Sequence, residues 1–283
     1  MPGFRLFVLS LLAMVAFAGN SLLCRVALAA GQIDAASFTA IRLLSGAAIL
    51  VGIMAYRNRA RPVGGNWPSA VALFVYAAGF SFAYVNLPAA TGALVLFGAV
   101  QVTMIGFGIW SGERLNGRQI LGVLFAAGGL MALLLPGVQT PSFTAALLML
   151  GAGVAWGVYS LRGRGRGDPA HETAGNFVRA APMAVILSIL FYSSADIEAA
   201  GVAYAVASGA LASGVGYAIW YMALPHLKAT TAATIQLSVP ALAAAGGVML
   251  LSEPFTVRLA VSSVAILGGV AIFIKSKSEA EHA

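Results

Sequence analysis

The chain has 283 residues, of which 60% are hydrophobic and only 9% are charged, with a formal net charge of +7. A soluble domain typically carries about 25% charged residues, so this composition argues against a water-facing surface and a soluble enzyme. The basic residues stand in short clusters between apolar segments, which indicates membrane topology and not a nucleic-acid-binding surface.

The first apolar segment shares features with a signal peptide. Arg5 precedes an apolar run, and Ala16-Phe17-Ala18 resembles a cleavage site. The run nevertheless continues to about Ala30, which is long enough to span a bilayer, and a related segment recurs inside the chain. We therefore interpret this segment as a first span that is retained.

Apolar segments of roughly 18 to 25 residues follow one another along the whole chain. Ten of them lie near residues 5–29, 34–56, 68–87, 90–110, 118–135, 143–161, 174–194, 198–224, 228–250 and 257–275. Each span must satisfy its own backbone hydrogen bonds in lipid, and the sequence lacks the alternating pattern of a β-barrel. The sequence therefore predicts an all-α polytopic membrane protein with about ten transmembrane helices.

The connectors between these segments test the count. If the N-terminus is cytoplasmic, the opposite side of the membrane holds only Arg25 and Arg258, while Arg42 and Arg179 fall within spans. The cytoplasmic side then holds Arg5, Arg57, Arg59, Arg61, Arg114, Arg118, Arg162, Arg164, Arg166, Lys228, Lys275 and Lys277. Because cytoplasmic loops are enriched in basic residues, we predict ten spans in a bacterial inner membrane with both termini in the cytoplasm.

An internal repeat becomes visible when the sequence is shifted by 140 residues. Residues 79–134 then lie over residues 219–274 without a gap, with ten matches in 56 positions. The informative matches are Glu113 with Glu253, Arg118 with Arg258, and Gly128-Gly129 with Gly268-Gly269. We expect two repeats of five helices each, residues 1–137 and residues 138–283.

An odd number of spans in each repeat means that the second copy enters the membrane in the opposite sense. Inverted repeats are a recurrent design of secondary transporters, because two copies of one fold can exchange shapes and open a central site to either side. The repeat therefore favours a transporter over a structural membrane protein.

Several stretches of the second copy carry a family resemblance. They are Trp220-Tyr-Met-Ala-Leu, residues 229–236, Pro240, Leu251-Ser-Glu253-Pro and Gly268-Gly-Val. Together they resemble the EamA-type domain of the drug/metabolite transporter superfamily, over essentially the whole chain. The first copy is a weaker match, with Val100 where the second has Pro240. By overall similarity, the chain is most like the YddG branch, which exports aromatic and other amino acids.

The resemblance implies a central cavity lined by spans one, three, four, six, eight and nine, and export as the direction of transport. Polar groups in these spans are expected to face the cavity or the protein interior, because an unpartnered polar group in hydrocarbon is costly. The candidates are Asn20, Ser21, Tyr84, Asn86, Gln101, Tyr159, Tyr217, Gln236 and Ser238.

Aromatic residues stand next to some of these polar groups. Phe17 lies three residues before Asn20, and Trp156 lies three residues before Tyr159 in the equivalent helix of the second copy. Phe80 and Trp220 coincide under the 140-residue shift. Such platforms suit an aromatic or apolar side chain, or a cation over a ring. The alternative is that these aromatics only pack against neighbouring helices.

Three further residues are assigned structural roles. Pro240 removes a backbone donor within the ninth span and is expected to act as a kink or hinge. Glu113 and Glu253 lie at span ends beside short turns, where a carboxylate can meet the N-terminus of the following helix.

Catalytic chemistry, a cofactor and a metal are not expected. The sequence has no HExxH motif, no paired intramembrane acids and no serine–histidine constellation, and its single cysteine is Cys24. All nine acids fall in connectors, tails or span ends, whereas proton-coupled pumps commonly carry an intramembrane acid. The sequence therefore predicts transport without carboxylate-based proton coupling.

The sequence predicts an inner-membrane exporter of small solutes, most of all neutral and aromatic amino acids, that works by alternating access. Its expected partners are a small-molecule substrate and membrane lipid, with a monomer sufficient for function. The alternative function on the same fold is efflux of drugs or cationic metabolites. A channel and a structural membrane subunit remain open alternatives from other classes.

Overall fold

The computed structural model describes residues 3–56, 64–110, 112, 115–134, 142–163, 168–223, 226–227, 235–236 and 238–280. In the first half these residues form α1 (Gly3–Ala29), α2 (Ala35–Tyr56), α3 (Trp67–Tyr84), α4 (Ala89–Trp110) and α5 (Gly117–Leu134). In the second half they form α6 (Phe143–Gly163), α7 (Pro169–Leu190), η1 (Tyr192–Ser194), α8 (Ala199–Val206), η2 (Ala207–Val215), α9 (Gly216–Ala223), α11 (Ser238–Leu251) and α12 (Val257–Ala280).

Seven helical segments are long and apolar enough to cross a membrane, with α8, η2 and α9 joined into one of them. Three shorter apolar stretches, Gly117–Leu133 in α5, Ser238–Leu251 in α11 and Val257–Phe273 in α12, lie at the remaining predicted spans. Every predicted span therefore overlaps a described helix, which confirms an all-helical polytopic membrane protein.

The seventh span begins five residues earlier than predicted. The side chain of Asp168 accepts a hydrogen bond from the Ala170 amide, and Pro169 occupies the first helical position. Both features favour a helix start. The Asp168 side chain accepts from an amide that has no partner within the helix, and proline has no amide proton to leave unpaired. The first turn of α7 contains polar residues, so a boundary drawn from apolarity alone places the start of the helix too late.

The sequence led us to expect a regular α-helix for the eighth span, but the structure differs. Its middle third, η2, is a π-helix, which is wider than an α-helix and occurs often at functional sites. Gly209 lies against the backbone of Arg42 in α2, and a side chain there would collide with the Arg42 carbonyl. The small residues of η2 therefore let the wide turn approach α2 closely.

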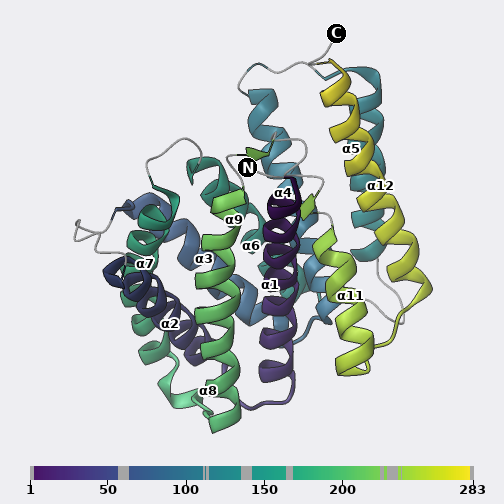
Figure 1. Cartoon of the computed structure of the whole chain (residues 1–283). Coiled ribbons are helices and arrows are strands. Elements are labelled where there is room, and N and C mark those ends of the chain that lie inside the picture. The colour runs from purple at the N-terminus through teal and green to yellow at the C-terminus, as the bar shows by residue number, and fades with distance from the viewer. Residues whose placement is uncertain are drawn as a thin grey trace.

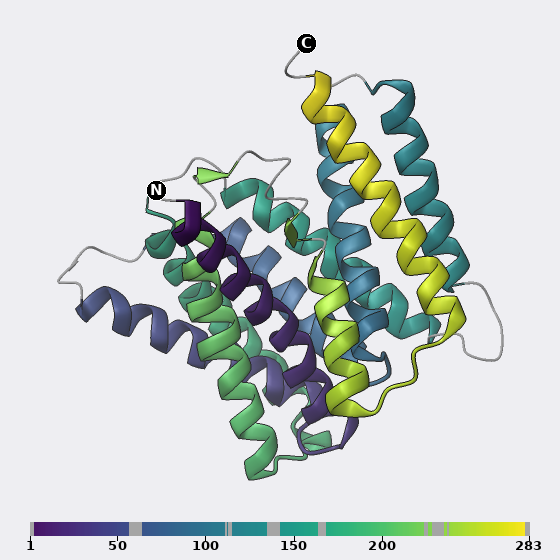
Figure 2. The same ribbon diagram turned by 45° about the vertical axis from the view of Figure 1, so that its right-hand side comes forward.

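The helices form a main bundle with one pair at its side (Figures 1 and 2). In both views α5 and α12 run side by side, and each has its most extensive contacts with the other. A Cβ at Gly122 would come 2.5 Å from the Gly269 carbonyl oxygen, and one at Gly269 would come 2.5 Å from the Gly122 carbonyl oxygen. Glycine on both sides thus brings the two backbones together.

Glycine also sets the contact between α6 and α4. A Cβ at Gly153 would come 2.6 Å from both the Ala99 side chain and the Leu96 carbonyl oxygen, whereas one at Gly151 would meet no atom within 4 Å. We expect Gly153→Ala to destabilise the protein by about 1–3 kcal/mol, the usual cost of overpacking. Gly151→Ala, the matched control, should be neutral or slightly stabilising because alanine favours helix.

Thermal unfolding of the two variants in detergent measures this difference. Equal melting temperatures for Gly153→Ala and Gly151→Ala would show that the close approach of α4 and α6 contributes little to stability.

Candidate functional site

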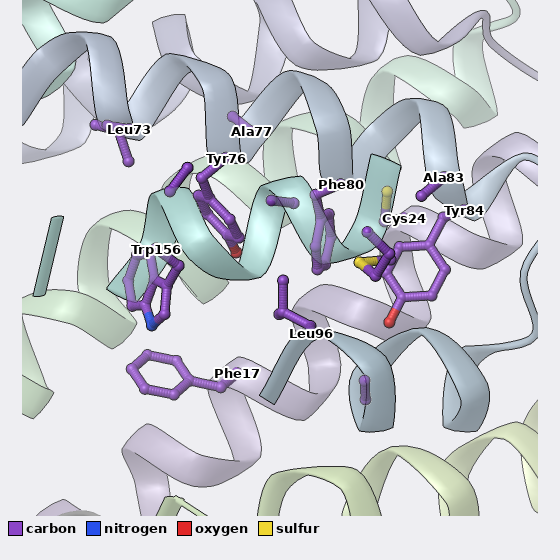
Figure 3. Packing of buried hydrophobic residues seen from close by; sticks show 14 of the residues in the cluster. Phe17, Cys24, Leu73, Tyr76, Ala77, Phe80, Ala83, Tyr84, Leu96 and Trp156 are labelled. Atoms are coloured by element: carbon purple, nitrogen blue, oxygen red, sulfur yellow. The ribbon is translucent and has the colours of Figure 1, made fainter. Parts of the chain in front are cut away.

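Helix α3 presents three aromatic side chains at intervals of four residues. Tyr76, Phe80 and Tyr84 therefore share one face of the helix, as Figure 3 shows. The ring centroids of Tyr76 and Phe80 are 5.4 Å apart, and those of Phe80 and Tyr84 are 4.6 Å apart. This stripe faces the interior of the bundle, since all three residues are buried.

Trp156 of α6 joins this stripe to the other helices. Its ring centroid lies 4.8 Å from that of Tyr76, 5.0 Å from that of Tyr217 and 5.5 Å from that of Tyr159. Phe17 of α1 completes the group with an edge contact to Trp156 at 6.3 Å (Figure 3). Trp156 is thus one of the side chains through which helices of the two halves meet.

Further rings pack around Phe17 and Tyr217. Phe17 makes edge contacts with Tyr217 at 5.6 Å and with Trp220 at 6.1 Å, and Phe177 of α7 lies 5.9 Å from Tyr217. We call the whole group the aromatic cluster: Phe17, Tyr76, Phe80, Tyr84, Trp156, Tyr159, Phe177, Tyr217 and Trp220. Each member is less than one-tenth exposed, so the cluster is closed to solvent on all sides.

A chain of hydrogen bonds runs along the aromatic cluster. Ser208 of η2 donates to Asn20 at 2.6 Å, and the Asn20 amide lies 3.4 Å from the Tyr76 hydroxyl, to which it donates. Arg42 donates from Nη2 to the same hydroxyl at 3.1 Å and from Nε to Ser213 at 3.2 Å. Both ends of the chain lie in the π-helical segment, which explains how η2 is held against α1 and α2.

Arg42 is the one charged side chain of this chain of hydrogen bonds. It is 1% exposed, and its guanidinium lies 5.2 Å from the centre of the Tyr76 ring and 4.9 Å from that of Phe80. No described acid pairs with it. A positive charge therefore lies in the interior of the bundle, held by aromatic faces and two hydroxyl groups.

Eight of the ten predicted binding residues lie together. Phe17, Phe80, Tyr84, Trp156, Tyr159, Tyr217 and Trp220 belong to the aromatic cluster, and Asn20 is bonded to it. Gln101 is buried on α4 but has no described contact with the cluster, and Gln236 is half-buried in the short segment before α11. Their binding roles stay predictions.

The sequence reasoning did not single out Arg42 or Tyr76 as binding residues. An arginine inside a predicted span is costly and marks a functional site by default, so Arg42 carried a usable signal. Tyr76 carried a weaker one, the four-residue spacing to Phe80 and Tyr84. Neither signal specified that the two side chains contact each other, because they lie on different helices.

The predicted structural residues occupy different places. Pro240 is the third residue of α11, so its missing amide proton interrupts no hydrogen bond inside that helix, and a hinge there stays a prediction. Glu253 does meet a helix N-terminus, but that of α4, where it accepts from the Ala89 amide at 2.8 Å, and not that of the following helix α12. Glu113 lies outside the described residues.

Glu253 also closes one end of the bundle. It forms a salt bridge with Arg25 of α1 at 3.1 Å, and Arg25 donates in addition to the carbonyl oxygens of Tyr84 and Val85, each at 3.0 Å. The two charged side chains are 20% and 12% exposed. They join α1, the turn between α3 and α4, and the connector after α11.

A cavity of about 810 Å³ lies towards the other end of the bundle, between α2, α7 and α9. Its lining is mainly apolar and includes Leu50, Ile53 and Met222, with His171 and Tyr221 among its polar groups. Helix α9 is shared between this cavity and the aromatic cluster, to which it contributes Tyr217 and Trp220.

Comparisons with known proteins agree with this architecture. An uncharacterized protein of Pseudomonas aeruginosa is 56% identical over 275 residues, which cover 97% of this chain and 96% of that protein. A solved crystal structure matches 94% of this chain and 97% of its own chain with a TM-score of 0.67 at 21% identity, which shows a shared fold. The model of the EamA-like transporter family matches residues 143–275. Residues 143–275 thus form an EamA-like transporter domain.

Proposed function

We propose that this protein exports neutral and aromatic amino acids across the bacterial inner membrane by alternating access. The observation that carries the proposal is the closed aromatic cluster, built from helices of both halves around Trp156. Flat aromatic surfaces suit an aromatic or large apolar side chain, while the hydroxyl and amide groups beside them can orient polar ends.

The pattern of helix contacts supports two inverted repeats, residues 1–137 and residues 138–283. Under that pairing the contact of α3 with α6 corresponds to that of α9 with α1, and the contact of α4 with α6 to that of α11 with α1. Contacts of α2 with α7, α4 with α11 and α5 with α12 join each helix to its own counterpart. Such pseudo-twofold packing is what exchange of shapes between two copies requires.

The two ends of the bundle differ in a way that fits alternating access. The end predicted to face outwards is held by Arg25 and Glu253, whereas the cavity near Tyr56 and His171 lies towards the predicted cytoplasmic end. We interpret the arrangement as a central site closed off from outside, which opens when the Arg25–Glu253 contact breaks.

Uptake into proteoliposomes tests the proposal. Purified protein should catalyse saturable uptake of radiolabelled phenylalanine, tryptophan or methionine down a substrate gradient, at a rate that an imposed proton gradient leaves unchanged. The reason is that the described acids lie at helix ends or in connectors, where they cannot relay protons through the centre.

Two results would contradict the proposal. Uptake that collapses without a proton gradient would overturn the uncoupled mechanism. If the protein takes up a cationic dye and none of the amino acids tested, the fold assignment still stands but the function is drug efflux.

A further inference from the structure

We propose that Arg42 and Tyr217 bind the carboxylate of the transported solute, so that an anionic group is a condition for transport. This inference rests on the proposed function and deepens it, because it assigns recognition of the carboxylate that every amino acid carries to two named residues. It follows from three features of the residues around Arg42.

The first feature is an unpaired donor on Arg42. Nε donates to Ser213 and Nη2 donates to Tyr76, but Nη1 is buried and has no hydrogen-bond partner. A buried cation with an unused donor and no counter-ion is costly in a dry interior. A ligand carboxylate would supply both the missing acceptor and the missing negative charge.

The second feature is an unpaired hydroxyl in the same aromatic cluster. The Tyr217 oxygen is also buried without a partner, and its ring contacts Trp156 at 5.0 Å, as does that of Tyr76 at 4.8 Å. The Tyr76 oxygen accepts both of its described hydrogen bonds, from Arg42 and Asn20, so its own proton is available to donate. The lone pairs of a carboxylate match these donors.

The third feature argues against a cationic solute. The rings of Tyr76 and Phe80, which could otherwise hold a cation, already have the Arg42 guanidinium at 5.2 and 4.9 Å from their centres. A second cation in the cluster would meet Arg42 at short range, where like charges repel strongly in a medium of low dielectric constant. Other rings of the cluster, among them those of Phe17, Trp156 and Trp220, have no described cation over them and are left for a substrate side chain.

Competition against phenylalanine uptake in proteoliposomes tests the inference. The competitors are unlabelled phenylalanine, phenylalanine amide, phenethylamine and 3-phenylpropionate, which differ in the carboxylate and the amine while keeping the ring. In the unmodified protein, phenylalanine and 3-phenylpropionate should compete well. The amide and phenethylamine should require roughly tenfold or higher concentrations, because they lose a charge-assisted hydrogen bond.

Variants assign this discrimination to residues. The relevant quantity is the competing concentration of phenylalanine amide divided by that of phenylalanine. Arg42→Gln should bring this ratio close to one, whatever uptake rate remains. Tyr217→Phe should lower the ratio severalfold. Arg179→Gln and Tyr204→Phe are matched controls and should keep the full ratio, since the Arg179 Nη1 is occupied by the carbonyl oxygens of Gly64 and Gly175 and Tyr204 lies outside the cluster.

The outcomes separate the inference from the proposed function. Phenylalanine uptake with an unchanged ratio in Arg42→Gln would overturn the inference and leave amino-acid transport standing. If Arg42→Gln is inactive or unfolded, Tyr217→Phe decides, because it removes a hydroxyl that has no partner to lose. If the unmodified protein transports neither phenylalanine nor any other carboxylate tested, both the inference and the proposed function are overturned.

Discussion

Replacing Trp156 by alanine should reduce the apparent affinity for aromatic amino acids by roughly 100-fold. Trp156 contacts Phe17, Tyr76, Tyr159 and Tyr217, so its loss removes a ring that contacts aromatic side chains of both halves. Truncating a large buried aromatic side chain costs about 3–5 kcal/mol, and even part of that energy lost from binding gives a change of this size.

Concentration-dependent uptake in proteoliposomes measures the effect. Trp156→Phe keeps an aromatic platform and should lose much less affinity than Trp156→Ala. Trp110→Ala, the matched control, removes a tryptophan that is 84% exposed at the end of α4 and should leave uptake unchanged. Equal losses in Trp156→Ala and Trp110→Ala would show that the aromatic cluster is not the binding site.

Replacing Glu253 by glutamine should raise the labelling rate of Cys24 by roughly tenfold or more. Cys24 is the single cysteine of the chain, is fully buried, and directly precedes Arg25 on α1. The carboxylate of Glu253 accepts hydrogen bonds from Arg25 and from the Ala89 amide. A hydrogen bond to a charged group contributes about 1.5–3 kcal/mol, so removing the charge favours states in which this end is open.

Reaction with a small membrane-permeant maleimide, followed over time in native membranes, gives the rate without any engineered cysteine. Glu198→Gln is the matched control, because Glu198 is an exposed acid before α8 whose side chain caps no helix amide. A Cys24 labelling rate that is the same in Glu253→Gln and in Glu198→Gln would mean that the salt bridge does not keep this end closed.

The positions of the helices could be predicted well, because long apolar segments have few alternatives in lipid. The π-helical turn of η2 could not, since Ser208, Gly209 and Ser213 are equally compatible with a regular helix; the turn depends on contacts with Asn20 and Arg42 in other helices. The early start of α7 at Pro169 was likewise hidden, because polar capping residues lower the local apolarity.

The candidate site was predictable in part. The rings of Phe17, Trp156 and Trp220 stood out as bulky groups at repeat-related positions, and Phe17 does contact both tryptophans. Which face of a helix turns inwards was harder to predict, because most spans are apolar nearly all round. The pairing of Arg42 with Tyr76 arises only when α2 and α3 are brought together in the folded bundle.

The pairing of α5 with α12 has a consequence for biosynthesis. Helix α12 follows all the other described helices in the chain, whereas α5 leaves the ribosome more than a hundred residues earlier. During that interval the backbone groove at Gly122 faces lipid or a chaperone, since the Gly269 backbone that fills it has not yet been made. A nascent chain that stops before Val257 therefore has the glycine surface of α5 without the helix that packs against it.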